Sequence, residues 1–278
     1  MTDLKVTESG ILVNVGCGAS PTPGWHNFDN SFSVRVARCP GINAMGASTL
    51  FLGPRSADLV AVARSGNIRF ANAAARIPCA TETARAVYSS HMIEHLDRGE
   101  ARAFLAEVKR VLRPGGIVRL AAPDLSRLIA DYVATGDADG FVAGTHMGLD
   151  RPTGLRARAR WALVGPRHHL WMYDGDSLLR LLAEAGFADG EILAPGSTRI
   201  ADPGQLDLHE RATESVYAEA VRPLHACGPH PAHHRHGGRQ VRLAAPRQLR
   251  AARPRPAARR PLPGAEPAAA PPGDRAAG

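Results

Sequence analysis

The sequence lacks long apolar runs, a leader segment and paired cysteine motifs. Among its 278 residues, no apolar run approaches the roughly 18 that a membrane span requires. The opening segment, MTDLKVTESG, is polar rather than leader-like. None of the four cysteines (Cys17, Cys39, Cys79 and Cys227) forms a C-x-x-C pair. These absences predict a cytoplasmic protein with reduced thiols and no membrane span.

Excess charge is absent from most of the chain. Residues 1–223 hold 24 of the 34 Lys+Arg and 24 of the 26 Asp+Glu, so their net charge is zero. The excess of +8 lies entirely in residues 224–278. A neutral body offers no general groove for a phosphate backbone, so no specific nucleic-acid partner is expected.

Residues 224–278 also lack Phe, Trp and Tyr, and they hold ten of the 22 prolines. Such a segment cannot bury enough apolar surface to offset an ordering entropy of roughly 1–2 kcal/mol per residue, which predicts a disordered tail after a domain of residues 1–223. Its arginines favour at most non-specific contact with RNA or anionic lipid. Its histidines and Cys227 are irregularly spaced, and we expect no metal site anywhere in the chain.

A strand–turn–strand pattern opens the body. Ile11–Val15 is rich in β-branched residues and leads into Gly16-Cys17-Gly18, as a buried strand leads into a tight turn. A second short run, Trp25–Phe28, ends in Asp29, and an acid at the end of a second strand commonly binds ribose hydroxyls. The pattern is compatible with a nucleotide site, and equally with a plain glycine turn.

Strand and helix patterns then alternate. The clearest helix is Arg98–Leu112, which ends at the terminator Arg113-Pro114-Gly115-Gly116. Residues 137–174 include a Gly- and Arg-rich stretch and are interpreted as a lid or acceptor insertion. The alternation predicts a mostly parallel sheet with helices on both faces. Further strands are expected at 68–70, 86–89, 117–122, 187–193 and 214–220, and further helices at 58–64, from Asp124 to near Gly136, and at 178–185 after an Asp176-Ser177 cap.

Six segments in order resemble a class I S-adenosylmethionine-dependent methyltransferase, in particular the predicted bacterial methyltransferases of the type 11 group. The matching segments are LVNVGCG, GWHNFD, VYSSHMIEHL, LRPGGIVRLAAPDL, WMYDGDSLLRLLAEAGF and ERATESVYAEAVRP. The resemblance implies an α/β, Rossmann-like fold with a mostly parallel seven-stranded sheet and an antiparallel last strand. It also implies S-adenosylmethionine as cofactor, with contacts at Gly16, Cys17, Gly18, Asp29 (ribose), Asn72 and Ala73 (adenine), and Ser90.

Three departures from the family pattern lie around the glycine turn. Asn14 stands where many members have an acid, and Ser20 stands where many have a third glycine. The link from Val15 to Trp25 is only nine residues, short for a strand–helix–strand crossover.

The chemistry expected is methyl transfer to a small-molecule, sugar or lipid-linked acceptor, at a hydroxyl. Such an acceptor needs a base, and His91 at the end of the fourth strand is the candidate, with packing or cofactor contact as its alternative role. Glu94 is expected to favour the charged form of His91, or to cap the next helix together with His95. The acceptor pocket or a lid–core contact is predicted to include His168, His169, Tyr173 and Asp174.

Two other classes of function stay open from the sequence. A non-catalytic cofactor-binding module would also have the degenerate glycine motif. An NAD-dependent oxidoreductase would need a third glycine and an acid about 20 residues on, and Ser20 and the nearer Asp29 disfavour it.

Overall fold

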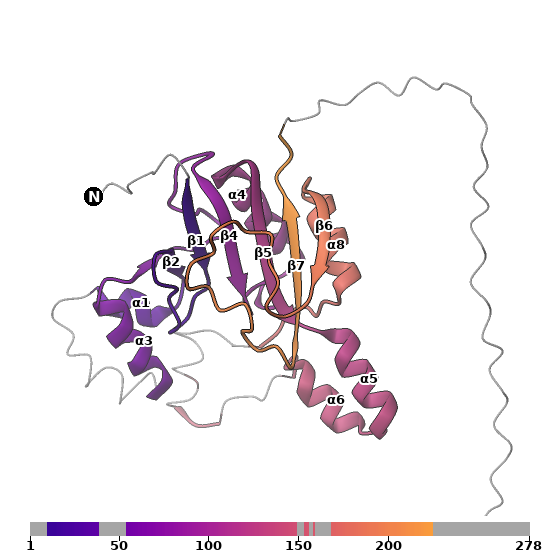
Figure 1. The fold of residues 1–278 in the computed structure, drawn as a ribbon. Helices are drawn as coiled ribbons and strands as arrows, with labels where there is room; N and C mark the ends of the chain where they lie inside the picture. Colours follow the sequence, from indigo (N-terminus) through magenta and orange to yellow (C-terminus); the bar gives the residue numbers. More distant parts are fainter. Residues whose placement is uncertain (1–9, 39–53, 149–152, 156–157, 159–167, 225–278) are drawn as a thin grey trace, which may run out of the picture. The chain divides into compact units, whose positions relative to one another are not determined.

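A seven-stranded sheet with the order β3-β2-β1-β4-β5-β7-β6 organises the chain (Figure 1). β7 runs antiparallel to both β5 and β6, and the remaining pairs are parallel. This confirms the predicted fold, including the antiparallel last strand. The strands are β1 (Ile11–Val15), β2 (His26–Asp29), β3 (Ile68–Phe70), β4 (Ala84–Ser90), β5 (Leu112–Pro123), β6 (Ala188–Leu193) and β7 (Ser215–Val221).

The structure is a computed structural model that describes residues 10–38, 54–148, 153–155, 158 and 168–224. The chain divides into two units, Met1–Gly228 and Pro229–Gly278, and the second lies outside the described residues. The predicted disordered tail also lies outside them, apart from Leu224. The helices are α1 (Phe32–Ala37), α3 (Pro54–Arg64), the 3-10 helix η2 (Ile93–His95), α4 (Arg98–Val111), α5 (Leu125–Thr135), α6 (Ala138–Thr145) and α8 (Gly175–Glu184).

One face of the sheet, here called the helix face, is covered by α4, η2 and α8. Side chains that alternate along the central strands, such as Val13, Val87 and Leu120, pack there against Phe104 and Leu105 of α4 in the main core. Asp97 and Glu100 form a capping box at the start of α4, which places its apolar stripe on the sheet. The helix predicted at Arg98–Leu112 is therefore confirmed to within one residue.

The opposite face, here called the loop face, is covered over the central strands by residues 194–214, which join β6 to β7 (Figure 1). Ile200 and Leu206 of this loop pack against Tyr88, Ala121 and Tyr217. Helices α1 and α3 cover only the β2–β3 side of this face. The prediction of helices on both faces therefore holds, and among the described residues the centre of the loop face is covered by a loop rather than a helix.

Several boundaries differ from the sequence prediction, and for two of them the contacts show the cause. β5 begins at Leu112 instead of residue 117, because Gly115 donates its N–H to Arg222 and Gly116 accepts one from it, so the Pro-Gly-Gly segment continues the β5–β7 ladder. α8 is capped by Asp174, in a box with Ser177, rather than by Asp176-Ser177.

The predicted insertion at 137–174 contains a helix that the sequence did not indicate. α5 and α6 extend together beyond the carboxyl edge of the parallel strands (Figure 1). α5 buries none of its residues among those described, although its apolar stripe is clear. Within the described ranges, no helix combines the length and the apolar character needed to cross a membrane.

Candidate functional site

A cavity of about 210 Å³ opens at the carboxyl edge of the parallel strands. It lies between the turn after β1, the end of β4 and the loop face's covering segment. Three predicted cofactor residues, Gly16, Cys17 and Ser90, line it. Ser90 Oγ is buried and has no hydrogen-bond partner among the described residues. The other lining residues are Asn14, Ser20, Pro21, Thr22, Pro23, Tyr88, Gln205, Leu206, Asp207 and Glu210.

The glycine turn touches the segment that follows β4. Gly16 adopts φ +72°, and a Cβ built there would lie 2.9 Å from Cβ of Met92. Only glycine fits at this position, because both the backbone conformation and the space exclude a side chain. The turn's backbone is internally bonded: the N–H groups of Gly16 and Cys17 donate to the carbonyl of Phe28 at 2.8 and 3.2 Å.

Asp29 anchors the same turn. Its Oδ2 accepts the N–H of Gly18 at 3.0 Å, and its Oδ1 accepts the N–H of Ser31 at 2.8 Å. Its backbone carbonyl accepts the N–H of Ala71 at 3.1 Å, which brings the predicted adenine residues Asn72 and Ala73 beside it. Gly18, Asp29, Asn72 and Ala73 are described residues that adjoin the cavity's turn but do not line the cavity itself.

Asn27 holds the short link between β1 and β2, which is fully described and contains no helix. Its Oδ1 accepts the N–H of Thr22 at 2.8 Å, and its Nδ2 donates to the carbonyls of Thr22 and Trp25, both at 3.0 Å. Asn14, which replaces the family's acid, donates to Thr22 Oγ1 at 3.1 Å. Two buried amides therefore fix the segment that a crossover helix would otherwise order.

Cys17 stays a neutral thiol at this site. Burial, and then the nearby Asp29 carboxylate, raise the pKa of its thiol to about 12. The side chain donates weakly to the carbonyl of Gly18 at 3.6 Å. A protonated thiol is a poor nucleophile, so Cys17 contributes shape rather than reactivity.

His91 lies where β4 turns into η2, with φ +46°. Its Nδ1 is 3.1 Å from Nη1 of Arg211, and its Nε2 is 2.7 Å from Oγ of Ser215. A guanidinium only donates, so Nδ1 accepts and Nε2 carries the proton that is donated to Ser215. The sequence did not indicate either partner, but the antiparallel β7 brings its first residue, Ser215, to the carboxyl edge of β4 and β5.

The expected effect of Glu94 on His91 is wrong. Burial first, and then the Arg211 cation, lower the pKa of His91 to about 3. Glu94 Oε1 lies 3.5 Å from His91 Nδ1, but this carboxyl is itself completely buried, and burial raises its pKa to about 7. The alternative capping role is also wrong, because Asp97 caps α4.

The four predicted acceptor residues separate into two groups. His169 lies beside η2: its Nε2 is 4.0 Å from Glu94 Oε1, and its ring packs edge-on against His95. His168 accepts a hydrogen bond from His95 through its carbonyl. Tyr173 is fully buried in the main core and Asp174 caps α8, so these two make the lid–core contact.

Comparison with known proteins agrees with the predicted family. Residues 50–120 match the model of a methyltransferase domain. A search of curated proteins found no match. The matched stretch covers α3 to most of β5 and leaves out the atypical turn after β1.

Solved structures of similar proteins include S-adenosylmethionine-dependent methyltransferases. The Mesorhizobium loti enzyme has 15% identity, covers 79% of this chain and 94% of its own, and gives a TM-score of 0.41. The Methanosarcina mazei protein has 13% identity, with coverage of 79% and 95% and a TM-score of 0.40. A methyltransferase in complex with the Haloferax volcanii Trm112 activator has 14% identity, with coverage of 79% and 85% and a TM-score of 0.41. Similarities this low assign no substrate or partner.

Proposed function

We propose that the chain is a class I S-adenosylmethionine-dependent methyltransferase that methylates a hydroxyl of a small-molecule, sugar or lipid-linked acceptor. The proposed cofactor is S-adenosylmethionine. The observation that carries the proposal is the cavity bounded by Gly16, Cys17 and Ser90 at the carboxyl edge of the sheet. Ligands of open α/β sheets bind at this edge.

Asp29 is the proposed ribose ligand. Each carboxylate oxygen accepts one backbone N–H, and a carboxylate has about four acceptor sites, so ribose hydroxyls can add to both oxygens. The adjacent Asn72 and Ala73 are proposed to contact adenine, and Gly18 the ribose side of the turn. Ser90, whose hydroxyl makes no hydrogen bond among the described residues, is proposed to contact the methionine end.

His91 is proposed to receive the acceptor's proton at Nδ1 after Arg211 has moved away, because the Arg211 cation is one of the causes that lower the pKa of His91. In the neutral tautomer set by Ser215, this nitrogen holds the lone pair that Arg211 occupies. The side chain of Arg211 is 55% exposed, so an acceptor hydroxyl can displace it without leaving a buried cation. Alignment of the acceptor oxygen, methyl carbon and sulfur supplies most of the remaining rate enhancement, up to about 7–11 kcal/mol.

Calorimetry of Asp29→Ala tests the cofactor site. The wild type is expected to bind S-adenosylmethionine with a dissociation constant in the micromolar range, about −8 kcal/mol. Asp29→Ala is expected to weaken binding by about 1.5–3 kcal/mol, because charge-assisted hydrogen bonds to ribose are lost. Since Asp29 also holds Gly18 and Ser31, thermal melting must show that the variant is folded. Asp131→Ala, an exposed carboxylate on α5, is the matched control. Unchanged affinity in Asp29→Ala would refute the assignment.

A non-catalytic cofactor-binding module is the second candidate, and one observation favours it. The N–H groups of Gly16, Cys17, Gly18 and Ser20 all donate to acceptors within the protein, so the turn offers few donors to a ligand. Binding of S-adenosylmethionine without turnover on a panel of sugar, lipid-linked and phenolic hydroxyls would support this candidate. The genomic neighbours of the gene would narrow the panel. Cytoplasmic location and the absence of a specific nucleic-acid partner stay predictions.

A further inference from the structure

Glu94 is a buried carboxyl group whose nearest titratable neighbours are two histidines, with His91 Nδ1 at 3.5 Å and His169 Nε2 at 4.0 Å from its Oε1. It is 0% exposed, and neither of its oxygens has a hydrogen-bond partner among the described residues. Taking an unpaired carboxylate out of water is costly, so buried carboxylates are normally paired or coordinate a metal. The mechanism proposed above gives Glu94 no role.

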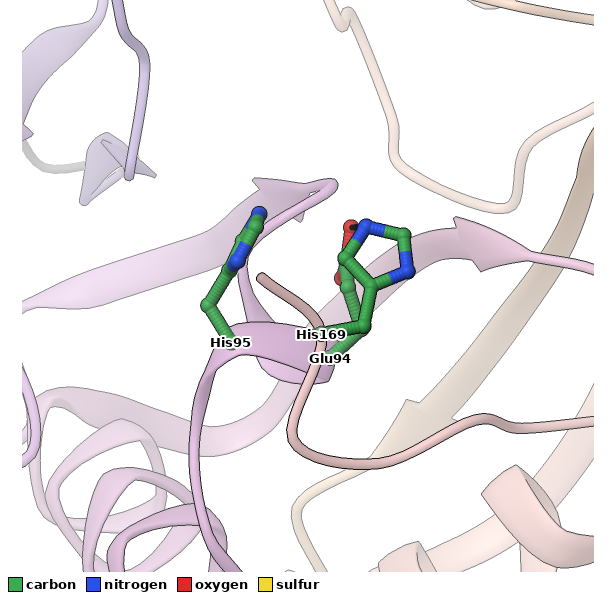
Figure 2. Close-up of side chains that lie close together, drawn as sticks. All are labelled: Glu94, His95 and His169. Carbon is green, nitrogen blue, oxygen red and sulfur yellow. Dashed lines mark ion pairs between the residues drawn. The ribbon is translucent and has the colours of Figure 1, made fainter. Parts of the chain in front are cut away.

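Two imidazoles lie around this carboxylate. Figure 2 shows Glu94 and His95 rising from η2, with His169 reaching the same place from the segment before α8. One ligand atom from each of the three residues lies within 4.8 Å of the others. The two segments are joined, because the N–H groups of Leu170 and Trp171 donate to the carbonyl of Glu94 at 2.7 and 3.1 Å.

The ring of His95 is oriented as a metal ligand would be. Its Nδ1 lies 2.9 Å from the carbonyl oxygen of His168, which only accepts, so Nδ1 carries the proton. In the neutral ring, the lone pair is then on Nε2. A backbone carbonyl that fixes the tautomer in this way is a common outer partner of metal-bound histidine.

We propose that Glu94, His95 and His169 bind a divalent transition-metal cation such as Zn²⁺, Mn²⁺ or Fe²⁺. Two imidazoles and one carboxylate are ligands that suit these ions, whereas Ca²⁺ and Mg²⁺ prefer sites made of oxygen alone. Metal–ligand bonds of about 2.0–2.2 Å place the ligand atoms of a tetrahedral site about 3.3–3.6 Å apart. The three ligand atoms lie within 4.8 Å of one another, and Glu94 Oε1 and His169 Nε2 are 4.0 Å apart, so binding requires side-chain rotations that bring the widest pair closer by up to about 1.5 Å.

The metal site adjoins the proposed reaction site. Glu94 Oε1 is 3.5 Å from His91, and Met92 touches Gly16 of the cofactor turn. The following role rests on the proposed function. A cation held by Glu94, His95 and His169 would lower the pKa of an acceptor hydroxyl beside it, and the proton would go to His91 or to solvent. The acceptor oxygen then bonds to the methyl carbon, and the carbon–sulfur bond breaks with its electron pair kept by sulfur, giving the methyl ether and S-adenosylhomocysteine.

Zn²⁺ titration by calorimetry tests the site in the full chain. The tail is a competing source of ligands, so the background protein carries Cys227→Ser and asparagine in place of His225, His230, His233, His234 and His236. This background is expected to bind one equivalent of Zn²⁺. Glu94→Gln and His169→Asn are expected to lower the affinity by more than the roughly 10–100-fold that loss of an outer partner causes. His209→Asn, an exposed imidazole outside the three, is expected to bind as the background does.

Thermal melting and Co²⁺ absorption keep the test independent of activity. Zn²⁺ is expected to raise the melting temperature of the background but not of Glu94→Gln, since only the first gains binding energy in the folded state. Metal-free melting of both proteins shows whether each is folded. Equal affinity in Glu94→Gln and the background, or no saturable binding of Zn²⁺ or Co²⁺, would overturn the proposal. Calorimetry with S-adenosylmethionine in EDTA tests the proposed function separately, because Gly16, Asp29 and Ser90 do not belong to the metal set.

Discussion

The two faces of the sheet are covered by different physical means. On the helix face, Phe104, Leu105 and Val108 of α4 bury apolar surface against the strands. On the loop face, a polar pair lies under residues 194–214: Arg119 and Glu219 are both 0% exposed, with Nη1 and Oε1 2.8 Å apart. The pair holds the loop's backbone, since Glu219 accepts the N–H of Arg199 and Arg119 donates to the carbonyl of Ser197.

The difference in covering explains why the cavity lies on the loop face. Apolar helix packing is continuous and leaves no room for a ligand, because a helix matches the pleated surface along its length. A loop held at a few polar points can leave space beside them. The cavity opens beside the polar pair Tyr88 and Glu210, whose Oη and Oε2 are 2.7 Å apart. The loop face therefore carries the candidate site, and the helix face supports it.

The largest expected effect comes from breaking the buried pair under the loop. Glu219→Ala leaves the Arg119 cation buried without its partner and removes acceptors from Thr198 and Arg199. We expect the free energy of unfolding to fall by about 3–5 kcal/mol, measured by urea denaturation. Limited proteolysis in buffer is expected to cleave first within residues 194–214.

Two further variants separate charge burial from loop contacts. Arg119→Met combined with Glu219→Leu removes both charges, so it is expected to lose less stability than Glu219→Ala. Leu105→Ala on the helix face is expected to cost about 2–5 kcal/mol without preferential cleavage of the loop. Early cleavage of the same loop in Leu105→Ala would contradict the division between the two faces.

The helix face was predictable from sequence because its signals are local. The periodicity of residues 98–112 predicted α4, and Asp124 and Gly136 were correctly placed around α5, where they are its N-cap and its left-handed C-cap. Local signals also misled: Pro114-Gly115-Gly116 is a strong helix terminator, but its backbone pairs with Arg222, more than 100 residues away.

The loop face and much of the site depend on pairs that local patterns do not report. His91 was identified as a candidate because it ends a strand, yet its partners Arg211 and Ser215 are 120 and 124 residues away. The grouping of Glu94, His95 and His169 was missed for the same reason, although the spacing H-x-x-E-H at 91–95 is a known metal-binding pattern in helices. No sequence pattern identified Asn27, because its role is to form hydrogen bonds with the backbone of a loop.

An intermediate effect on stability is expected from Asn27, which bonds the backbone of the link between β1 and β2 at the edge of the loop face. Asn27→Ala leaves the N–H of Thr22 and the carbonyl of Trp25 without their Asn27 partner, and the carbonyl of Thr22 keeps only the N–H of Trp25. We expect a loss of about 2–3 kcal/mol in the free energy of unfolding, together with weaker binding of S-adenosylmethionine, because the turn after β1 loosens. Calorimetry and urea denaturation measure the two effects.

Asn27→Asp separates the hydrogen bond that Asn27 accepts from the two that it donates. It keeps the acceptor for Thr22 N–H and loses both donated hydrogen bonds. Its second oxygen would face the carbonyl oxygens of Thr22 and Trp25, so a loss of stability at least as large as in Asn27→Ala is expected at pH 7. Unchanged affinity for S-adenosylmethionine in Asn27→Ala would show that the link between β1 and β2 does not shape the cofactor site.

The smallest expected effect is on the helix face, at the rim of α4, and it depends on pH. Glu107 accepts the N–H of Ile77 at 2.9 Å and two hydrogen bonds from Arg110 at 2.7 and 2.8 Å. The Arg110 hydrogen bonds, and then the Ile77 N–H, hold the pKa of Glu107 below its usual value of 4.5. The ionised form thus stabilises the fold at pH above about 4.5, and this contribution is lost as pH falls through the folded-state pKa.

Glu107→Gln is expected to cost about 1 kcal/mol at pH 7, since the pair is partly exposed. Urea denaturation from pH 7 to pH 3 is expected to show the wild type and the variant converging at the acid end. Glu184→Gln, an exposed carboxylate on α8, controls for the loss of one negative charge. A difference between wild type and Glu107→Gln that stays constant to pH 3 would mean that the side chain acts through packing rather than through its charge.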